Sequence, residues 1–329
     1  MKPSALVIVL LLTGLYILPT AAHAVPATQS PSSEQTVPEH VILFVVEGVD
    51  RQALKAGPMP ALDRLVTTGS VTWSATTVTP PLRLPAMASL FTGLPVEKHG
   101  ITWDAFEFSR GYPRPPTVFD YLDLSGGRDS AIFFMDESLY QLAKPEPYTD
   151  YQLCGPLRPE CTPERLVSYI RQYLQKASSG HGYGHAILSL PHFLIVHLPE
   201  GARAAALHGW ESSNYRTALR AVDQAIGAVL DIYRKHGLLK RTTVFVTGLS
   251  GTGTGGESSA ASSSLVPWIA SGVGVKAGHT IHQPVSILDT GATVLRALRL
   301  HTHTEWDSRA VEEIFRDTGA ISAISTKGR

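Results

Sequence analysis

Three long apolar runs constrain the fold of this chain most strongly. They read HVILFVVEGVD at residues 40–50, FLIVHL at 193–198 and TTVFVTG at 242–248. Each run is continuously apolar rather than alternating, which is typical of strands buried on both faces of a parallel sheet. Such a sheet needs helices over both of its faces, so the runs predict an α/β protein.

Helical patterns separate these runs. The clearest covers about 213–236 and carries one apolar stripe at steps of three and four. The stripe consists of Leu219, Val222, Ile226, Val229 and Tyr233. Further helices are expected over 59–68, 84–93, 116–123, 163–177 and 286–299. The alternation predicts a three-layer αβα sandwich with a mostly parallel central sheet, in which chemistry takes place at the carboxyl ends of the strands.

The composition allows a substantial core and excludes a protein that tracks nucleic-acid phosphates. The chain has 329 residues, of which 43% are hydrophobic, with 28 basic and 28 acidic side chains. Because there is no basic excess, we expect no nucleic-acid partner. The length allows two domains, but one large α/β unit fits equally well. We place it at 39–318, after a Pro/Ser/Thr/Gln-rich flexible linker at 25–38 and before a C-terminal tail at 319–329.

The N-terminus has the pattern of an export signal at residues 1–24. Lys2 precedes the apolar run ALVIVLLLTGLYIL, and AAHA offers a small-residue cleavage site after Ala24. An uncleaved membrane anchor is the alternative, but the run is short against the ~20 apolar residues that a bilayer-spanning helix needs. We therefore expect a periplasmic or secreted protein with no membrane span after signal cleavage.

The chain contains two cysteines, Cys154 and Cys161, close together in LCGPLRPEC. In an exported chain this pair predicts a disulfide across a loop rather than a metal site. The closed loop is short, so we expect its stabilising effect to be modest.

Several segments, in order, resemble the alkaline phosphatase superfamily, closest to its type I phosphodiesterase/nucleotide pyrophosphatase branch, and are also similar to sulfatases. They are HVILFVVEGVD, MPALDRLVTTGSV, ASLFTGLPVEKHGI, ESSNYRTALRAVDQAIGAVLDIYRKHGLLKRTTVFVTG, LVPWIASGVGVKAG, QPVSILDTGATVLRAL and EWDSRAVEEIF. They run from about residue 40 to 315, and their order and spacing carry the resemblance. The resemblance implies an alkaline-phosphatase-like version of the αβα sandwich.

The resemblance also implies a mechanism. Active members hold two divalent ions, usually zinc, with Asp and His side chains at the strand ends. A Thr, Ser or formylglycine attacks phosphorus or sulfur, and the covalent intermediate is then hydrolysed. The ions lower the pKa of the nucleophile and stabilise the developing charge, and carboxylate and imidazole are ligands that such ions prefer.

Three positions of this chain depart from that pattern around the nucleophile. Glu47, in a Glu-Gly pair, stands where the family has Asp-Gly, so the carboxylate is one methylene longer. Arg83 stands at the nucleophile position, and a guanidinium is always protonated and has no lone pair to attack with. Asp104 stands where the phosphodiesterase branch has an Asn that steadies the transferred group, and a carboxylate there would repel phosphate or sulfate.

The remaining ligand positions are also degenerate. After FLIVHL, one register places Ala202 and Ala206 at the expected Asp-x-x-x-His pair, and counting forward from Pro199 gives Glu200 and Ala204 instead. Glu200 and His208 are candidate displaced ligands, although their spacing is wrong.

After TVFVT the expected Asp-His is Leu249-Ser250. Between His236 and His279 the chain has no Asp and no His, only Glu257. We therefore expect no resident metal or other cofactor, and a zinc or other divalent pair only if displaced ligands bind one.

We hypothesise that the Arg83 guanidinium occupies the cationic centre that metal ions hold in active members. There it would pair with Glu47, Asp104 or both, because a buried charge needs a partner and Arg suits bidentate pairing with carboxylates. The alternative is that Arg83 points into solvent across an open cleft.

Other motifs indicate less. GLSGTG at 248–253 approaches a nucleophile elbow but has Thr252 as its fifth residue and lacks the helix that should follow. The same glycines lack the Lys of a phosphate-binding loop. His301 and His303 form a His-x-His pair, and residues 181–185 form a His/Gly-rich loop; we interpret both as exposed. His99 is interpreted as structural.

Three hypotheses follow for the function. The first is an exported pseudoenzyme that binds an envelope component or a partner protein in the former catalytic cleft. The second is a metal-dependent hydrolase of phosphodiesters, phosphate or sulfate esters that uses displaced ligands. The third is a structural or assembly protein that uses only the outer surface of the fold.

Overall fold

An eight-stranded sheet forms the centre of the part of the chain that the computed structural model describes, residues 37–56, 59–145, 147–153, 161–180, 189–251, 264–302 and 304–316. Its strands are β1 (His40–Val46), β2 (Gly69–Thr76), β3 (Ser130–Phe134), β4 (Thr149–Leu153), β5 (Phe193–Leu198), β6 (Thr242–Thr247), β7 (Leu265–Gly272) and β8 (His279–Thr280). Their order across the sheet is β4-β3-β5-β1-β6-β7-β2-β8. Strand β7 runs antiparallel to both neighbours, and the other described pairs are parallel.

The central strand β1 shows why the sheet is covered on both faces. Every residue of β1 is buried, and its side chains alternate between two separate hydrophobic clusters. Leu43 packs in one cluster and its neighbours Ile42 and Phe44 pack in the other. Alternation of the side chains across the sheet therefore divides one apolar run between two cores.

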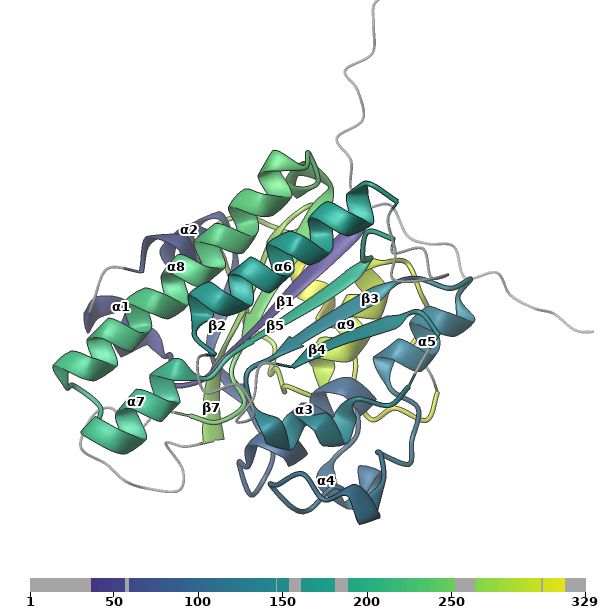
Figure 1. The fold of residues 1–329 in the computed structure, drawn as a ribbon, viewed down its shortest axis with the longest axis horizontal. Helices are drawn as coiled ribbons and strands as arrows, with labels where there is room; N and C mark the ends of the chain where they lie inside the picture. Colours follow the sequence, from purple (N-terminus) through teal and green to yellow (C-terminus); the bar gives the residue numbers. More distant parts are fainter. Residues whose placement is uncertain are drawn as a thin grey trace, which may run out of the picture. The chain divides into compact units, whose positions relative to one another are not determined.

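One face is covered by α1 (Arg51–Ala56), α2 (Pro60–Thr68), α6 (Pro163–Ser178), α7 (Glu200–His208) and α8 (Ser213–Lys235). Figure 1 shows α6 and α8 side by side across this face. All five residues of the predicted stripe on α8 are buried. The stripe predicted from the sequence is thus the side of α8 that packs on the sheet.

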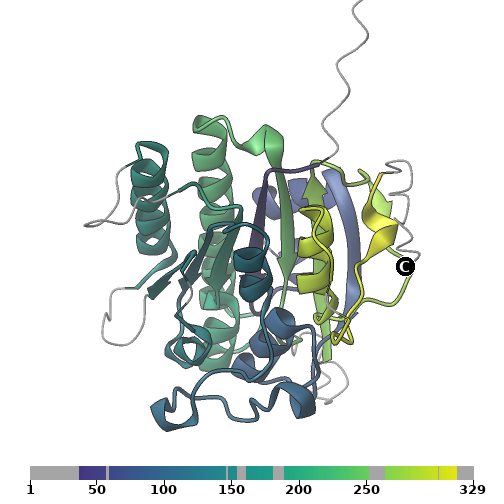
Figure 2. The ribbon, with the colours of Figure 1, turned by 90° about the vertical axis from the view of Figure 1, so that its right-hand side faces the viewer.

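The opposite face is covered by α3 (Arg83–Thr92), α4 (Val96–His99), α5 (Val118–Leu124) and α9 (Asp289–Ala297). Figure 2 shows helices on either side of the strands. Short 3-10 turns complete the described elements: η1 (Phe108–Arg110), η2 (Glu137–Leu142), η3 (Leu239–Arg241) and η5 (Glu312–Ile314). The predicted three-layer αβα architecture with a mostly parallel sheet is confirmed.

The predicted helices are present, with one correction. The helix expected over 286–299 is shorter, at Asp289–Ala297. The backbone before it extends the sheet instead, because Ser286 bridges to Thr76 and the Ile287 N–H donates to the Thr76 carbonyl at 2.9 Å. The three predicted runs correspond to β1, β5 and β6. The other strands, which include the eight-residue β2 and β7, and the helices α1, α4 and α7 were not predicted.

The described residues all belong to one unit, Gln35–Arg329. The expected signal peptide (1–24), most of the linker (25–38) and the tail (319–329) lie outside the described residues. No helix in the described part of the chain is both long and apolar enough to cross a membrane.

Candidate functional site: an arginine-centred ion cluster

Polar side chains from three neighbouring strands meet at the carboxyl edge of the sheet. Glu47 follows β1, His197 lies near the end of β5, and Asp136 follows β3. Strands β3, β5 and β1 are adjacent and parallel, and Val45 pairs with His197 across the ladder. In sheets of this kind, this edge is where binding and chemistry take place.

The turn after β1 fixes the position of Glu47. Gly48 has a φ of 76°, and a Cβ at that position would lie 2.3 Å from the backbone nitrogen of Ala202. The Ala202 N–H donates to the Glu47 carbonyl at 3.1 Å, and the Tyr215 hydroxyl donates to the Gly48 carbonyl at 2.7 Å. Only glycine fits this left-handed, closely packed position, so helices α7 and α8 hold the carboxylate in place.

Arg83, the first residue of α3, is bound by carboxylates from two strand ends. Its Nε donates to Glu47 Oε1 at 2.6 Å and its Nη2 donates to Glu47 Oε2 at 3.0 Å, which is a bidentate pair. Its Nη1 donates to Asp136 Oδ2 at 2.8 Å. The predicted pairing of Arg83 with Glu47 is confirmed, and the alternative of an arginine that points freely into solvent is wrong.

The other predicted partner, Asp104, has a different task. Its Oδ1 accepts the Leu84 N–H at 2.6 Å. Leu84 is in the first turn of α3, where backbone N–H groups have no acceptor within the helix. Asp104 therefore caps α3, and its negative charge offsets the unfavourable placement of a cation at a helix N-terminus.

His197 holds the far side of Glu47 as a neutral imidazole. The Met135 N–H donates to its Nδ1 at 3.4 Å, so the proton is on Nε2, which donates to Glu47 Oε1 at 2.6 Å. Burial lowers the pKa of His197 below its ordinary value, although Glu47 opposes the shift. The imidazole therefore donates a hydrogen bond to Glu47 without adding a positive charge to the site.

The hydrogen bonds to Glu47 set its charge state. Burial alone would raise the pKa of this carboxyl, but the donors His197 and Arg83 outweigh burial and lower it to about 2. In turn, burial would lower the pKa of Arg83, but Glu47 and Asp136 hold it above its ordinary value. The pair is ionised at every pH at which a protein of this kind works.

A second arginine extends the cluster over α7. Arg203 donates from Nη2 to Asp136 Oδ2 at 3.1 Å and to the Met135 carbonyl. Its Nη1 is 3.4 Å from Glu200 Oε1. Burial raises the pKa of Glu200 to about 7, because the long contact with Arg203 lowers this pKa by less than burial raises it. We call Glu47, Arg83, Asp136, His197 and Arg203 the Arg83 cluster.

The residues at this edge do not fit the pair of metal ions that the sequence resemblance implies. Both oxygens of Glu47 are engaged by Arg83, and the cation stands where an ion would have to bind. Ala202 and Ala206 are in α7 and offer no ligand atom, and Leu249 is buried and apolar.

The candidate displaced ligands do not converge either. Glu200 and His208 begin and end α7, and the eight residue steps between them span about 12 Å along the helix axis. No cluster of three or more His, Cys, Asp or Glu suited to a metal ion occurs in the described ranges.

The structure places the other predicted residues away from this cluster or leaves them outside its description. His99 is buried, with Nδ1 accepting the Ile101 N–H at 3.0 Å and Nε2 2.9 Å from the Ser89 hydroxyl, in keeping with a structural role. In GLSGTG, Ser250 and Gly251 are among the described residues, whereas Thr252 lies outside them.

His301 is exposed, whereas His303 and the loop 181–185 lie outside the described residues. Cys154 also lies outside the described residues, so the disulfide between Cys154 and Cys161 stays a prediction.

Sequence reasoning missed three members of the Arg83 cluster. His197 is a polar residue inside the buried run FLIVHL, which is a signal that it needs a hydrogen-bond partner. Asp136 follows the short run AIFFM, whose strand was not predicted. Arg203 gives no local signal, because it contacts Asp136 67 residues away.

Comparison with known proteins identifies the family that the sequence motifs resemble. The sequence model of the family described as type I phosphodiesterase / nucleotide pyrophosphatase matches residues 41–257. No curated protein sequence matches the chain.

Solved structures match the fold at low identity. Murine ectonucleotide pyrophosphatase / phosphodiesterase 5, as an inactive variant in complex with AMP, has a TM-score of 0.64 and 13% identity over 84% of this chain and all of the murine chain. A protein of glycosaminoglycan metabolism from Bacteroides thetaiotaomicron has a TM-score of 0.64 and 16% identity over 87% of this chain and 78% of its own. A protein in complex with its substrate D-glucosamine-2-N,6-O-disulfate has a TM-score of 0.61 and 13% identity over 86% and 81%. At these identities the likeness shows the fold alone.

Proposed function

Because this chain belongs to the type I phosphodiesterase/nucleotide pyrophosphatase family, we propose that it is an exported, non-catalytic member that binds a partner protein beside its former catalytic centre. The single observation that carries the proposal is the bidentate pair between Arg83 and Glu47. A guanidinium cannot act as a nucleophile, and its fixed positive charge disfavours metal ions at the carboxylate that it occupies.

The murine neighbour supports the same reading. Its inactive form carries a single Thr-to-Ala substitution. In this chain the position that resembles the nucleophile of the family holds a charged side chain that is engaged in three hydrogen bonds.

Exposed aromatic side chains next to the Arg83 cluster favour a partner protein over a purely structural role. Phe106, Phe108, Tyr112 and Tyr140 are all at least 40% exposed, and Phe108 is 87% exposed. The Phe106 and Tyr140 rings lie 5.9 Å apart. We call these four residues the aromatic rim. Aromatic residues are enriched in protein interfaces and supply many of their strongest contacts.

The aromatic rim lies on two chain segments that begin next to charged residues of the site. Its loop follows Asp104, the cap of α3, and its Glu107 N–H donates to Gln141 Oε1 at 2.8 Å. Gln141 and Tyr140 belong to η2, which begins directly after Asp136. Two charged residues of the site therefore anchor the two segments that carry the rim.

The loss of catalysis is tested with the purified chain without its signal segment. Metal content is measured by plasma mass spectrometry after incubation with zinc, and turnover is measured with bis(p-nitrophenyl) phosphate, p-nitrophenyl phosphate and p-nitrophenyl sulfate. We expect no stoichiometric zinc and no turnover above buffer, with an active phosphodiesterase of the family as the control. Stoichiometric zinc together with turnover would favour a hydrolase with displaced ligands and refute the proposal.

Partner binding is tested by site-specific photocrosslinking in the native host. A photoreactive amino acid replaces Phe108 in one variant and Leu124 of α5 in the control, since Leu124 is 82% exposed and outside the rim. We expect a discrete protein adduct from position 108 and none from position 124. Equal labelling from both positions, or no adduct from position 108, contradicts a docking role for the rim. Recovery of the chain from the exported fraction tests its location.

A further inference from the structure

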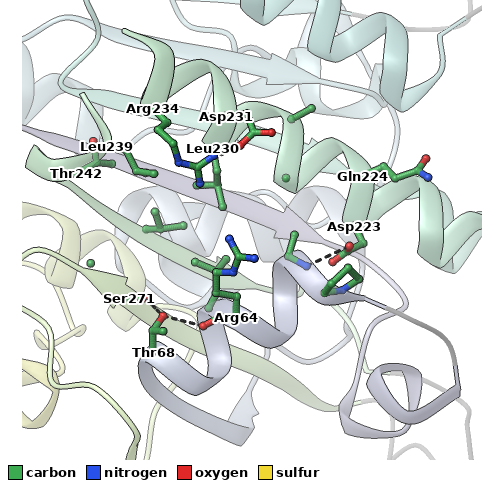
Figure 3. Close-up of a pocket in the computed structure, with 17 residues that line it drawn as sticks. Arg64, Thr68, Asp223, Gln224, Leu230, Asp231, Arg234, Leu239, Thr242 and Ser271 are labelled. Atoms are coloured by element: carbon green, nitrogen blue, oxygen red, sulfur yellow. Dashed lines mark hydrogen bonds and ion pairs between the residues drawn. The ribbon is translucent and has the colours of Figure 1, made fainter. Parts of the chain in front are cut away.

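A second candidate site lies far from the Arg83 cluster, in a pocket between α2 and α8. Its cavity volume is about 550 Å³, within the range of small-molecule sites in proteins. Figure 3 shows α2 and α8 on its two sides, with the Arg64 side chain extending from α2 into the gap and Arg234 approaching from α8. We call it the α2–α8 pocket.

The strand register places this pocket at the opposite edge of the sheet from the Arg83 cluster. Its lining includes Thr242, the first residue of β6, and Gly272, the last residue of antiparallel β7. Gly272 pairs with Thr243, so both mark the amino ends of the parallel strands. A ligand here would touch no residue of the cluster.

The base of the pocket is apolar. Leu65, Leu230 and Val244 line it, and each is less than 10% exposed. The helices approach closely at Gly227, where a Cβ would lie 3.5 Å from the Cβ of Ala61. The lack of a side chain at Gly227 leaves space between the helices that an apolar group can fill, which is favourable in proportion to the area removed from water.

The charged groups of the pocket are engaged, with one exception. Asp223 accepts the Ala61 N–H at 3.2 Å and the Leu62 N–H at 2.9 Å, so its charge serves the N-terminus of α2. Asp231 pairs with Arg234 on the same helix. Arg64 has no ion-pair partner among the residues that the structure describes, and only its backbone carbonyl is hydrogen-bonded by nearby side chains.

From this arrangement, we propose that the α2–α8 pocket binds a small amphipathic anion, with the apolar body against Leu65, Leu230 and Val244 and a single acidic headgroup on Arg64. The apolar base excludes a purely polar ligand such as a free sugar. A cationic amphiphile is disfavoured, because the carboxylates of Asp223 and Asp231 are already bound. The headgroup can be a carboxylate, sulfonate or phosphate monoester, since Arg binds all three through the same donors.

The test uses 8-anilinonaphthalene-1-sulfonate, whose fluorescence rises when its rings leave water, as the probe of the full exported chain. Hexanoate, octanoate and decanoate, each below its micelle-forming concentration, compete with the probe, and decylamine serves as the cationic control. We expect one saturable site per chain. Each added methylene should improve competition by up to about four-fold, and decylamine should not compete. Decyl phosphate against decanoate, with apolar tails of similar length, distinguishes a phosphate from a carboxylate headgroup.

Two variants locate the site. Arg64→Gln should weaken decanoate binding by about ten-fold through loss of the charged donor, whereas Arg171→Gln on the exposed side of α6 should leave it unchanged. Gly227→Leu should abolish binding by filling the pocket. If it does not fold, as judged by circular dichroism, Arg64→Gln still decides. Binding that survives Arg64→Gln, or equal competition by decylamine, overturns the proposal.

Discussion

Replacement of Arg83 by methionine isolates the contribution of the ion cluster to stability. Met has a similar length but no charge, so Arg83→Met leaves the Glu47 carboxylate, only 4% exposed, without its cation. Removal of one partner of a buried ion pair typically costs about 3–5 kcal/mol. The arginine itself is 24% exposed, which places the expected loss in the free energy of unfolding at the lower end, about 3 kcal/mol at pH 7.

The pKa of Glu47 gives the pH dependence of this loss. It is about 2 in the folded chain against an ordinary value of 4.5, because the donors His197 and Arg83 together outweigh burial, and Arg83→Met removes the second of these donors. A carboxyl whose pKa is depressed by folding stabilises the protein above its unfolded pKa, and this stabilisation is lost as the pH falls through the folded pKa. The cost of Arg83→Met should therefore be smaller near pH 3, where Glu47 is partly protonated in the unfolded chain, than at pH 7.

Urea denaturation, followed by tryptophan fluorescence at pH 7 and pH 3, measures both values. Arg171→Met on α6 is the control and should change stability by less than about 0.5 kcal/mol. Glu47→Gln combined with Arg83→Met should be more stable than Arg83→Met alone, because the uncompensated carboxylate is gone. A loss below about 1 kcal/mol at pH 7, or a loss that is the same at both pH values, would refute the role that we assign to the pair.

Four further substitutions test other parts of the structure. Asp104→Ala removes the cap at the Leu84 N–H and should lower the free energy of unfolding by about 1 kcal/mol in urea titration; no change would mean that water caps α3 equally well. Gly227→Ala should raise the melting temperature, because alanine in mid-helix adds about 0.5–1 kcal/mol to the free energy of unfolding. Gly48→Ala should instead lower the free energy of unfolding by more than about 2 kcal/mol, because position 48 has a positive φ and its Cβ would clash with backbone atoms. Equal changes in stability for the two variants would contradict this difference in backbone geometry. Burial raises the pKa of Glu200 to about 7, so wild-type stability should fall between pH 5 and pH 8 as this carboxyl ionises. Glu200→Gln should remove that decline, and a decline that persists would assign it to other groups.

The central layers of the fold could be predicted from the sequence because their signals are long and regular. The strand β1 and the stripe of α8 each extend over many residues of one pattern, and both were placed correctly. The strands β3 and β4 are only five residues each, too short for their patterns to stand out. Helix α7 has a run of alanines, which are the best helix formers, but at nine residues it carries no long apolar stripe.

The candidate site was predictable only in part, for a different reason. Pairing of Arg83 with Glu47 followed from the family resemblance, which implies that both residues lie at one site, together with charge, since a buried carboxylate requires a counter-charge. Asp136 and Arg203 could not be found this way. They lie 53 residues after Arg83 and 67 residues after Asp136 along the chain, and only the parallel arrangement of β3, β5 and β1 brings them together.

The charge balance of the cluster supports the proposal that no metal binds at this edge. Glu47 and Asp136 carry two negative charges, and Arg83 and Arg203 carry two positive ones, while His197 stays neutral as a donor. A metal ion would add positive charge to a set that is already balanced and would have to displace a bidentate guanidinium. The strand ends of this fold place carboxylates close together, and their repulsion needs a cation. Arg83 and Arg203 supply this positive charge as side chains of the protein itself, so the carboxylates need no metal ion that could dissociate.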